Sequence, residues 1–158
     1  MLKFILHDII FITTVFVLTA CSSVPRFTSS KNISDKTNGK RITAENDNLN
    51  LYNNSPVIET INGVASFYAD KYHGRITSNG ETYNMYGLTA AHPTFPHNTI
   101  IRVINLSNNK SAIVRINDRM PQRPDRIIDL SYGTALKLEM VEAGITEVTL
   151  EILEWGIE

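Results

Sequence analysis

The sequence predicts a mainly β domain of the small-barrel type, and three observations carry this prediction. From residue 57 onward the chain has short runs of β-branched residues separated by turn residues, a pattern typical of strands. Two of these runs flank the segment "SNNK", whose asparagines suit the positive φ angles of a hairpin turn. Only one segment has a convincing helical pattern. These features favour a barrel with one or two short helices.

The expected strands follow one another along the second part of the chain. They cover residues 64–68, 99–106, 111–117 and 147–153, and the apolar run 127–130 is a further piece of the core. The helix is expected in "LSYGTALKLEMVEAG", because Ser131 can cap its start and Gly144 follows its end.

Residues 1–20 have the pattern of a secretory signal. Lys3 precedes a mostly apolar run over residues 5–20, which is too short for a comfortable membrane span. The run ends in "LTAC", which resembles a bacterial lipobox, the motif whose cysteine is lipidated and becomes the new N-terminus. The alternative is a membrane-anchoring helix with an incidental cysteine.

Cys21 is the only cysteine in the chain, so no intramolecular disulfide can form. Lipidation gives this lone cysteine of an exported chain a role, and several acyl chains would hold the protein on a membrane stably. Ser22 follows it instead of the aspartate that keeps many Gram-negative lipoproteins from the outer membrane. We therefore expect a lipid-anchored protein of the cell envelope, at the outer membrane and facing the periplasm.

Residues 21–56 are expected to form a disordered tether that carries the lipid at its start. Asn, Ser, Lys, Asp and Thr dominate this stretch, and it has too little apolar area to offset the entropy of ordering its backbone. The folded domain is expected over residues 57–158. The net charge of −1 implies no general attraction to nucleic acid, and no nucleic-acid partner is expected.

Four segments of the domain carry a more specific signal when they are taken together and in this order. They are "GVASFYADKYHGRITSNGETYN" (63–84), "LTAAHPTFPHNTIIRVINL" (88–106), "VRINDRMP" (114–121) and "RIIDLS" (126–131). The set closely resembles the rare lipoprotein A (RlpA) family, whose members are septal-ring lytic transglycosylases. The resemblance implies a six-stranded double-psi β-barrel that acts on peptidoglycan glycan strands, in cell-wall remodelling or daughter-cell separation and with cell-division proteins as possible partners.

The sequence departs from the family pattern in two places. Many members carry a C-terminal peptidoglycan-binding SPOR domain, whereas this sequence ends at Glu158, so recruitment to the division site is not implied. Met120 stands where the family commonly has glycine, between the arginine and the proline, and is expected to alter the backbone of that loop.

A lytic transglycosylase cuts the bond between N-acetylmuramic acid and N-acetylglucosamine without water. The 6-hydroxyl of the muramic acid attacks its own anomeric carbon and leaves a 1,6-anhydro end. An intramolecular hydroxyl has a high effective concentration, so one carboxylic acid suffices to protonate the leaving oxygen and then accept the hydroxyl proton. Such a reaction needs no cofactor and no metal.

Asp118 and Glu81 are the two candidates for this acid. Asp118 leaves the end of a strand, and the resemblance places it in the substrate groove, so we predict that it is the catalytic acid and base. From the residues alone, Asp118 could instead cap a turn or pair with Arg119 or Arg126. Glu81 follows a turn at Gly80 and could be a solvated loop residue, whereas the resemblance makes it a groove residue that orients substrate or tunes the acid.

His92 is the third predicted catalytic residue. The proline after it keeps it out of the helical region, and its ring could hydrogen-bond to a carboxylate or to a sugar hydroxyl. The alternative is a buried histidine whose hydrogen bonds serve the core. The spacing of His73, His92 and His97 fits no zinc motif, and no second cysteine is present, so no metal site is expected.

The remaining predictions concern substrate contacts. Tyr68, Arg119 and Asn117 are predicted to bind the glycan, with the Tyr68 ring stacking on a sugar face. Asp129 is predicted to have a structural role, holding loop backbone and capping near Ser131, with a catalytic role as the alternative.

Two other functions compete with the enzyme. A binding module of the expansin kind would hold or loosen glycan in the same groove without cutting it. A lipoprotein scaffold would bind division proteins regardless of the groove carboxylates. The joint presence of Asp118, Glu81 and His92 favours the enzyme, because a binder would tolerate their loss.

Overall fold

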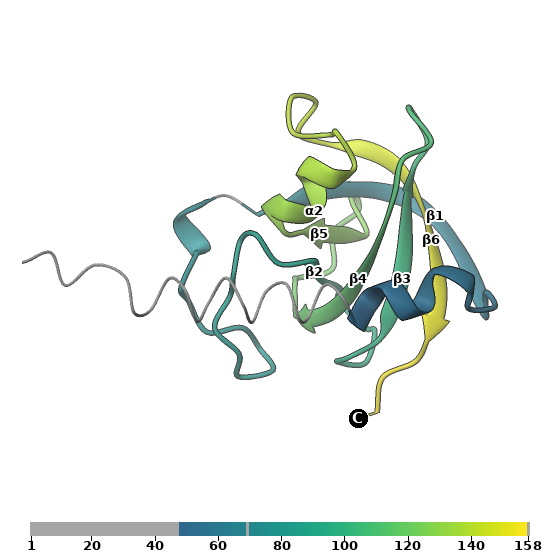
Figure 1. Ribbon diagram of the computed structural model, residues 1–158. Coiled ribbons are helices and arrows are strands. Elements are labelled where there is room, and N and C mark those ends of the chain that lie inside the picture. The colour runs from purple at the N-terminus through teal and green to yellow at the C-terminus, as the bar shows by residue number, and fades with distance from the viewer. Residues whose placement is uncertain (1–47, 69, 158) are drawn as a thin grey trace, which may run out of the picture. The chain divides into compact units, whose positions relative to one another are not determined.

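The computed structural model describes residues 48–68 and 70–157, and in this part the chain forms a closed barrel of six strands (Figure 1). The strands are β1 (Glu59–Phe67), β2 (Thr89–Ala91), β3 (Ile100–Asn105), β4 (Ser111–Asp118), β5 (Ile128–Leu130) and β6 (Thr146–Glu154). Two short 3-10 helices, η1 (Asn50–Asn54) and η2 (Asp70–Tyr72), and one α-helix, α2 (Tyr132–Lys137), accompany them. The predicted mainly β, six-stranded barrel is confirmed.

Around the barrel the strands neighbour one another in the order β1-β5-β2-β4-β3-β6. The pairs β1–β5 and β2–β4 are parallel, and the other four neighbouring pairs are antiparallel. Strand β2 therefore lies between β5 and β4, which are consecutive in sequence but do not pair with each other. This crossing brings the ends of β4 and β5 to the two sides of one very short strand.

The predicted hairpin is strands β3 and β4, which pair antiparallel from Ile100 opposite Arg115 to Ile104 opposite Ser111. Asn109 has a φ of 59° in the connecting turn, as the asparagines of "SNNK" indicated. The inward side chains of both strands fill the barrel, because successive residues of a strand face opposite sides. The fully buried large side chains at its centre are Ile101, Val103, Val114, Ile116, Ile128, Leu130, Leu138, Met140, Val148, Leu150 and Ile152.

The helix α2 is shorter than the sequence pattern predicts. Its start is as expected, since the Ser131 side chain accepts a hydrogen bond from the Thr134 amide. Its end falls at Lys137, because Glu139 adopts a left-handed φ of 50° and turns Met140 into the core. Gly144, with a φ of 74°, closes the following turn and not the helix.

Residues before position 57 also pack against the barrel. Leu49, which is 5% exposed, packs with Ile100, Ile113 and Leu153 against the outside of the barrel. The η1 helix that follows is fastened by Arg102, which donates a 2.9 Å hydrogen bond to the Asn53 carbonyl. Segments 1–20 and 21–47, with the predicted lipidation site Cys21, lie outside the described residues.

No helix within residues 48–68 and 70–157 is long and apolar enough to cross a membrane.

Candidate functional site

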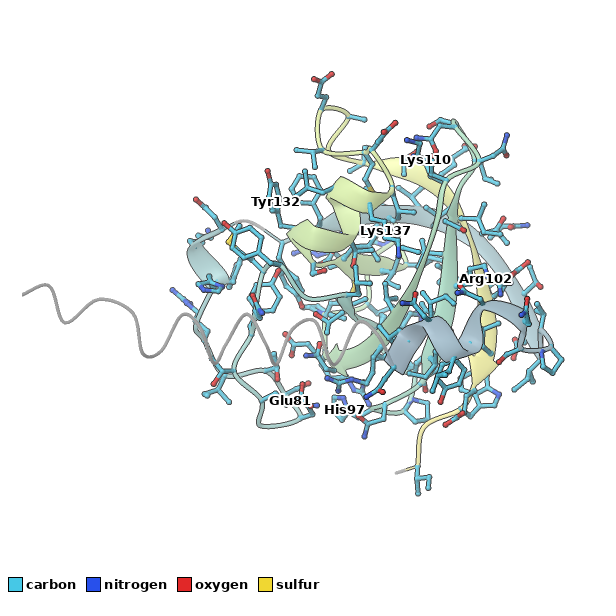
Figure 2. The ribbon with its side chains drawn as sticks, in the orientation of Figure 1. Glu81, His97, Arg102, Lys110, Tyr132 and Lys137 are labelled. Carbon is cyan, nitrogen blue, oxygen red and sulfur yellow. The ribbon has the colours of Figure 1, made fainter. Side chains whose placement is uncertain are left out.

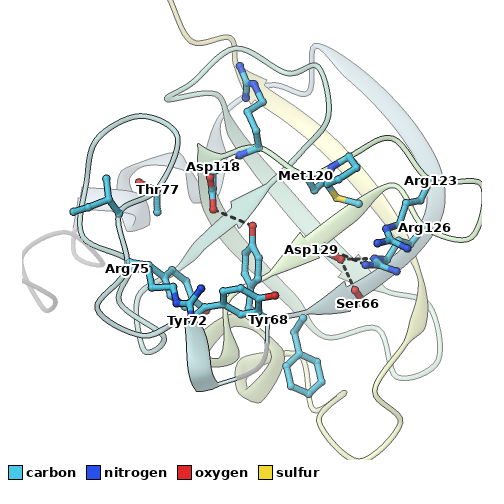
Figure 3. A pocket seen from close by; sticks show the side chains of 15 residues that line it. Ser66, Tyr68, Tyr72, Arg75, Thr77, Asp118, Met120, Arg123, Arg126 and Asp129 are labelled. Atoms are coloured by element: carbon cyan, nitrogen blue, oxygen red, sulfur yellow. Dashed lines mark hydrogen bonds and ion pairs between the residues drawn. The ribbon is translucent and has the colours of Figure 1, made fainter.

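A cavity of about 540 Å³ opens at one end of the barrel, where β1 and β4 end and β5 passes (Figure 3). Its walls come from the end of β1, the loop after η2, the loop that follows β4, and β5. The lining residues are Ser66, Phe67, Tyr68, Tyr72, Arg75, Ile76, Thr77, Tyr83, Asp118, Arg119, Met120, Pro121, Arg123, Arg126 and Asp129. The cavity thus combines two carboxylates, four arginines and several aromatic rings.

Asp118 is the last residue of β4, and its two carboxylate oxygens have different surroundings. Oδ1 accepts hydrogen bonds from the backbone amides of Ser78 and Arg119, each at 2.8 Å. Oδ2 accepts only one hydrogen bond among the described residues, from the Tyr68 hydroxyl at 3.1 Å. Oδ1 therefore fixes the orientation of the group, and Oδ2 is the oxygen placed to exchange a proton with a substrate.

Tyr68 lies just beyond β1 and packs its ring against Tyr72 and Tyr83, with ring centroids 5.6 Å and 5.2 Å away. Burial, followed by the negative charge of Asp118, raises the pKa of Tyr68, so the hydroxyl stays protonated and donates a hydrogen bond to Asp118. The ring predicted to stack on a sugar is thus half-buried between two others. Tyr72, 36% exposed, presents the more open aromatic surface of this cavity.

Asp129 is a second carboxylate of the same cavity, and it is 8% exposed. The Arg126 Nε donates a 2.6 Å hydrogen bond to its Oδ1, and the Ser66 hydroxyl donates to the same oxygen (Figure 3). Asp129 thus binds the side chain of Arg126 in the loop after β4, whereas its predicted contact was with loop backbone near Ser131. It also faces the cavity that contains Asp118.

Glu81 is not among the residues that line the cavity, and its carboxylate binds two side chains of β4. Both nitrogens at the tip of Arg115 donate to its carboxylate at 2.9 Å, and the Asn117 amide donates at 3.1 Å. Partial burial alone would raise the pKa of Glu81, but the hydrogen bonds from Arg115 and Asn117 outweigh it and hold that pKa below its ordinary value. A carboxylate kept ionised in this way is unsuited to donate a proton.

The ion pair between Glu81 and Arg115 attaches the loop of residues 77–81 to β4, and this loop contacts Asp118. The Glu81 carbonyl accepts hydrogen bonds from the backbone amide and the hydroxyl of Thr77, at 2.8 Å and 3.0 Å. The next residue, Ser78, donates its amide to Asp118. Figure 2 shows Glu81 on this loop. We therefore assign Glu81 as a positioning residue that acts on Asp118 through Ser78.

His92 follows β2 and is 8% exposed. Its ring stacks on Phe95 with centroids 3.5 Å apart, and its Nδ1 accepts hydrogen bonds from the backbone amides of Thr94 and Phe95. Burial, and then the positive charge of Arg119, lower the pKa of His92 to about 4. The neutral ring holds the turn after β2, and its own amide donates to the Asp118 carbonyl at 3.3 Å.

The depressed pKa of His92 makes stability depend on pH. An unfolded histidine binds a proton below its ordinary pKa of 6.5, whereas folded His92 stays neutral down to about 4. The contribution of neutral His92 to the free energy of unfolding is therefore fully present above pH 6.5. It is lost progressively as the pH falls to 4, by up to about 3 kcal/mol. Urea unfolding of the wild type and of His92→Asn at pH 7.0, 5.5 and 4.5 measures this. Identical slopes of stability against pH in both proteins would contradict it.

Arg119 and His97 each keep a polar atom that is buried and has no hydrogen-bond partner in the described part of the chain, Nη1 and Nδ1 respectively. Burial, and then the charge of Arg119, lower the pKa of His97. Arg119 lines the cavity beside Asp118, as expected for a residue predicted to contact substrate.

The structure thus separates the predicted site residues into two groups. Asp118, Tyr68 and Arg119 line the cavity, whereas Glu81, His92 and Asn117 are not among its lining residues. Asn117 is 4% exposed and donates to Glu81, so its role here is internal. None of the described His, Cys, Asp and Glu side chains gather in threes that could hold a metal ion.

Sequence reasoning missed several residues of the cavity wall. Ser66, Arg75 and Arg123 have no pattern of their own that points to a site. Only the segment "RIIDLS" contained a usable signal, because its aspartate interrupts an apolar strand. Met120 is 6% exposed in the same wall and does not require the φ angle of a glycine.

Comparison with known proteins identifies the family. Residues 60–150 match a family model described as "Lytic transglycolase". A protein of Campylobacter jejuni named "Endolytic peptidoglycan transglycosylase RlpA" is 52% identical over 98 residues, which are 62% of this chain and 36% of that protein. The protein of the same name from Neisseria meningitidis is 40% identical over 152 residues, covering 87% of this chain and 60% of that protein. The chain therefore spans about a third to three fifths of these curated relatives.

Solved structures show the same fold at low sequence identity. The Streptomyces papain inhibitor has a TM-score of 0.51 at 20% identity and covers 64% of this chain and 100% of its own. The apo expansin of Clavibacter michiganensis has a TM-score of 0.50 at 16% identity and covers 63% of this chain and 53% of its own. With the family match over most of the barrel and the curated relatives, these findings show that the chain belongs to the RlpA family of double-psi β-barrel proteins.

Proposed function

We propose that this protein is an endolytic lytic transglycosylase that cleaves peptidoglycan glycan strands between N-acetylmuramic acid and N-acetylglucosamine. The observation that carries the proposal is the setting of Asp118, a cavity-lining carboxylate fixed by two amides at one oxygen and hydrogen-bonded to the Tyr68 hydroxyl at the other. The names of the curated relatives support the substrate and the reaction type.

The chemistry requires one group that gives and takes a proton. Asp118 protonates the glycosidic oxygen as the bond to the anomeric carbon breaks, and it then accepts the proton of the muramic acid 6-hydroxyl, which closes the 1,6-anhydro ring. Tyr68 donates to the Asp118 carboxylate in its charged form and can accept from it in its protonated form, because a phenol does both.

The cavity suits an anionic polysaccharide. Four arginines and two aspartates line it, so its formal charge is positive, and peptidoglycan has carboxylates on its muramic acids or stem peptides. Arg123 is an exposed member of this lining. Tyr72, 36% exposed with Arg75 over its ring, adds an aromatic surface to the lining.

The test is a product analysis. The full-length chain is incubated with purified peptidoglycan, both intact and stripped of stem peptides, and soluble fragments are identified by mass spectrometry. Fragments that end in 1,6-anhydromuramic acid are expected. Fragments with ordinary reducing ends would mean hydrolysis, and no fragments from a protein that still sediments with the peptidoglycan would favour the expansin-like alternative.

We also propose that the protein acts from a lipid anchor on Cys21, at the outer membrane and facing the periplasm. The support is the lipobox-like "LTAC" and the serine that follows it. In a Gram-negative host, Cys21→Ala is expected to move the protein from the membrane fraction to the soluble fraction, as measured by fractionation and immunoblotting. Unchanged membrane association of this variant would refute the anchor.

A further inference from the structure

The register of three strands places Asp118 and Asp129 on either side of one residue. Ala91 of β2 is the partner of Asp118 in β4 and also the partner of Asp129 in β5. Neighbouring strands lie about 4.8 Å apart, so the two aspartate Cα atoms are roughly 10 Å apart across β2. Carboxylates that act on one sugar from two sides are typically about 5 to 9.5 Å apart, a range that this backbone spacing can provide.

Both aspartates line the same cavity, and Ala91 of β2 lies between their strands. Ala91 is fully buried and has only a methyl side chain. Figure 3 shows Asp118 and Asp129 on the two sides of the cavity, with the Tyr68 hydroxyl between them in this view. A sugar that reaches Asp118 in this cavity therefore comes within reach of Asp129.

The partners of the two carboxylates are of different kinds. Asp118 accepts from amides and from a neutral phenol, whereas Asp129 accepts from the Arg126 guanidinium and the Ser66 hydroxyl. A guanidinium forms charge-assisted hydrogen bonds, which favour an anionic acceptor. The guanidinium beside Asp129 therefore suits an anionic carboxylate, whereas Asp118 contacts a phenol that can both donate and accept.

We propose that Asp129 is a second catalytic carboxylate, which stays ionised and stabilises the positive charge that develops at the anomeric carbon. This inference rests on the proposed function. In the reaction, the bond from the anomeric carbon to the leaving oxygen breaks and a bond to the 6-oxygen forms. Asp118 gives one proton to the leaving oxygen and receives one from the 6-hydroxyl, so the atoms balance and Asp129 ends unchanged. Its contribution is electrostatic, of the kind that preorganised charges make in enzymes.

The first test is Asp129→Asn in the full-length chain, measured by the release of anhydro-ended fragments. A fall in kcat of about 100-fold is expected with KM changed by less than threefold, because the lost interaction is with the transition state. Asp125→Asn is the matched control, since this exposed carboxylate also pairs with Arg126 but lies outside the cavity wall. It is expected to retain wild-type kcat.

A structural role for Asp129 makes a different prediction. Asp129→Asn leaves Arg126 without its closer partner, which could itself disturb the loop. The double variant Asp129→Asn, Arg126→Gln removes both charges together, with Arg126→Gln alone as its reference. A catalytic role keeps the double variant near the activity of Asp129→Asn. Recovery to the level of Arg126→Gln would overturn the proposal.

A pair of ligands tests the charge directly and without turnover. The probes are a muramic-acid-shaped iminosugar, which is cationic at the ring nitrogen, and its neutral lactam, with binding measured by calorimetry. Asp129→Asn is expected to lose at least 30-fold in affinity for the cation and less than threefold for the lactam. Equal losses for both probes would overturn the proposal.

These outcomes separate the inference from the function on which it rests. A wild type that releases no anhydro-ended fragments refutes the proposed function, and the probe pair then decides on its own whether Asp129 stabilises a cation in the cavity. A wild type that releases them, with Asp129→Asn equally active, leaves the function intact and overturns the role of Asp129.

Discussion

Asp118→Asn is expected to lower the rate of glycan cleavage by about 1,000-fold, within the range that general acid–base catalysis contributes. The amide cannot give a proton to the leaving oxygen, yet its oxygen can still accept from the Ser78 and Arg119 amides that now bind Oδ1. Its NH₂ can donate to the Tyr68 hydroxyl, which can accept. The fold and the affinity for glycan should therefore stay near wild type.

The measurement is the initial rate of anhydro-ended product, with sedimentation on peptidoglycan and urea unfolding as companions. A variant of equal activity would falsify the assignment of Asp118. A variant that loses binding and activity in the same proportion would make Asp118 a ligand contact. Asp125→Asn serves again as the control, because it removes an exposed carboxylate near the same loop.

Glu81→Gln is expected to lower kcat by roughly 100-fold while KM stays within threefold, since small displacements of a catalytic group have effects of this size. The amide loses the paired contact with Arg115 that fastens the loop behind Asp118. The cost in stability should be only about 1 kcal/mol, because Glu81 is half-exposed and such ion pairs contribute little.

Glu151→Gln provides the matched control for Glu81. This variant also removes an arginine–carboxylate ion pair, that of Glu151 with Arg102 at 2.6 Å. Arg102 contacts η1 and is not a residue of the cavity lining. Similar stability losses with an activity loss in Glu81→Gln alone would support the positioning role. If Glu81 were itself the proton donor, Glu81→Gln would cost at least as much activity as Asp118→Asn and would remove one limb of the pH–rate profile.

The strands with strong local patterns were predictable from the sequence. The hairpin of β3 and β4 has alternating β-branched residues and an asparagine that accepts a left-handed φ. Strand β2 was not predicted, because it has three fully buried residues and so no alternation to detect. The helix α2 was predicted too long, since Leu138 and Met140 fit a helical face but are buried after the helix has ended.

The site was predictable only in part, because its contacts join residues far apart in sequence. Family resemblance pointed to Asp118, and the structure places it in the cavity. The ion pair of Glu81 with Arg115 joins residues 34 positions apart, so no local sequence pattern predicts it. The placement of Asp118 and Asp129 in one cavity depends on the register of β2 with β4 and β5. No short-range sequence pattern predicts such a register.

The crossing of β2 between β4 and β5 also has a consequence for when activity can appear. Strand β2 has only three residues, and it pairs with β4 in parallel, which requires a long chain excursion before the contact forms. The two aspartates approach each other only once both of these pairings exist. A partly folded chain therefore has no site of the proposed kind, because the two aspartates come together only when the barrel closes.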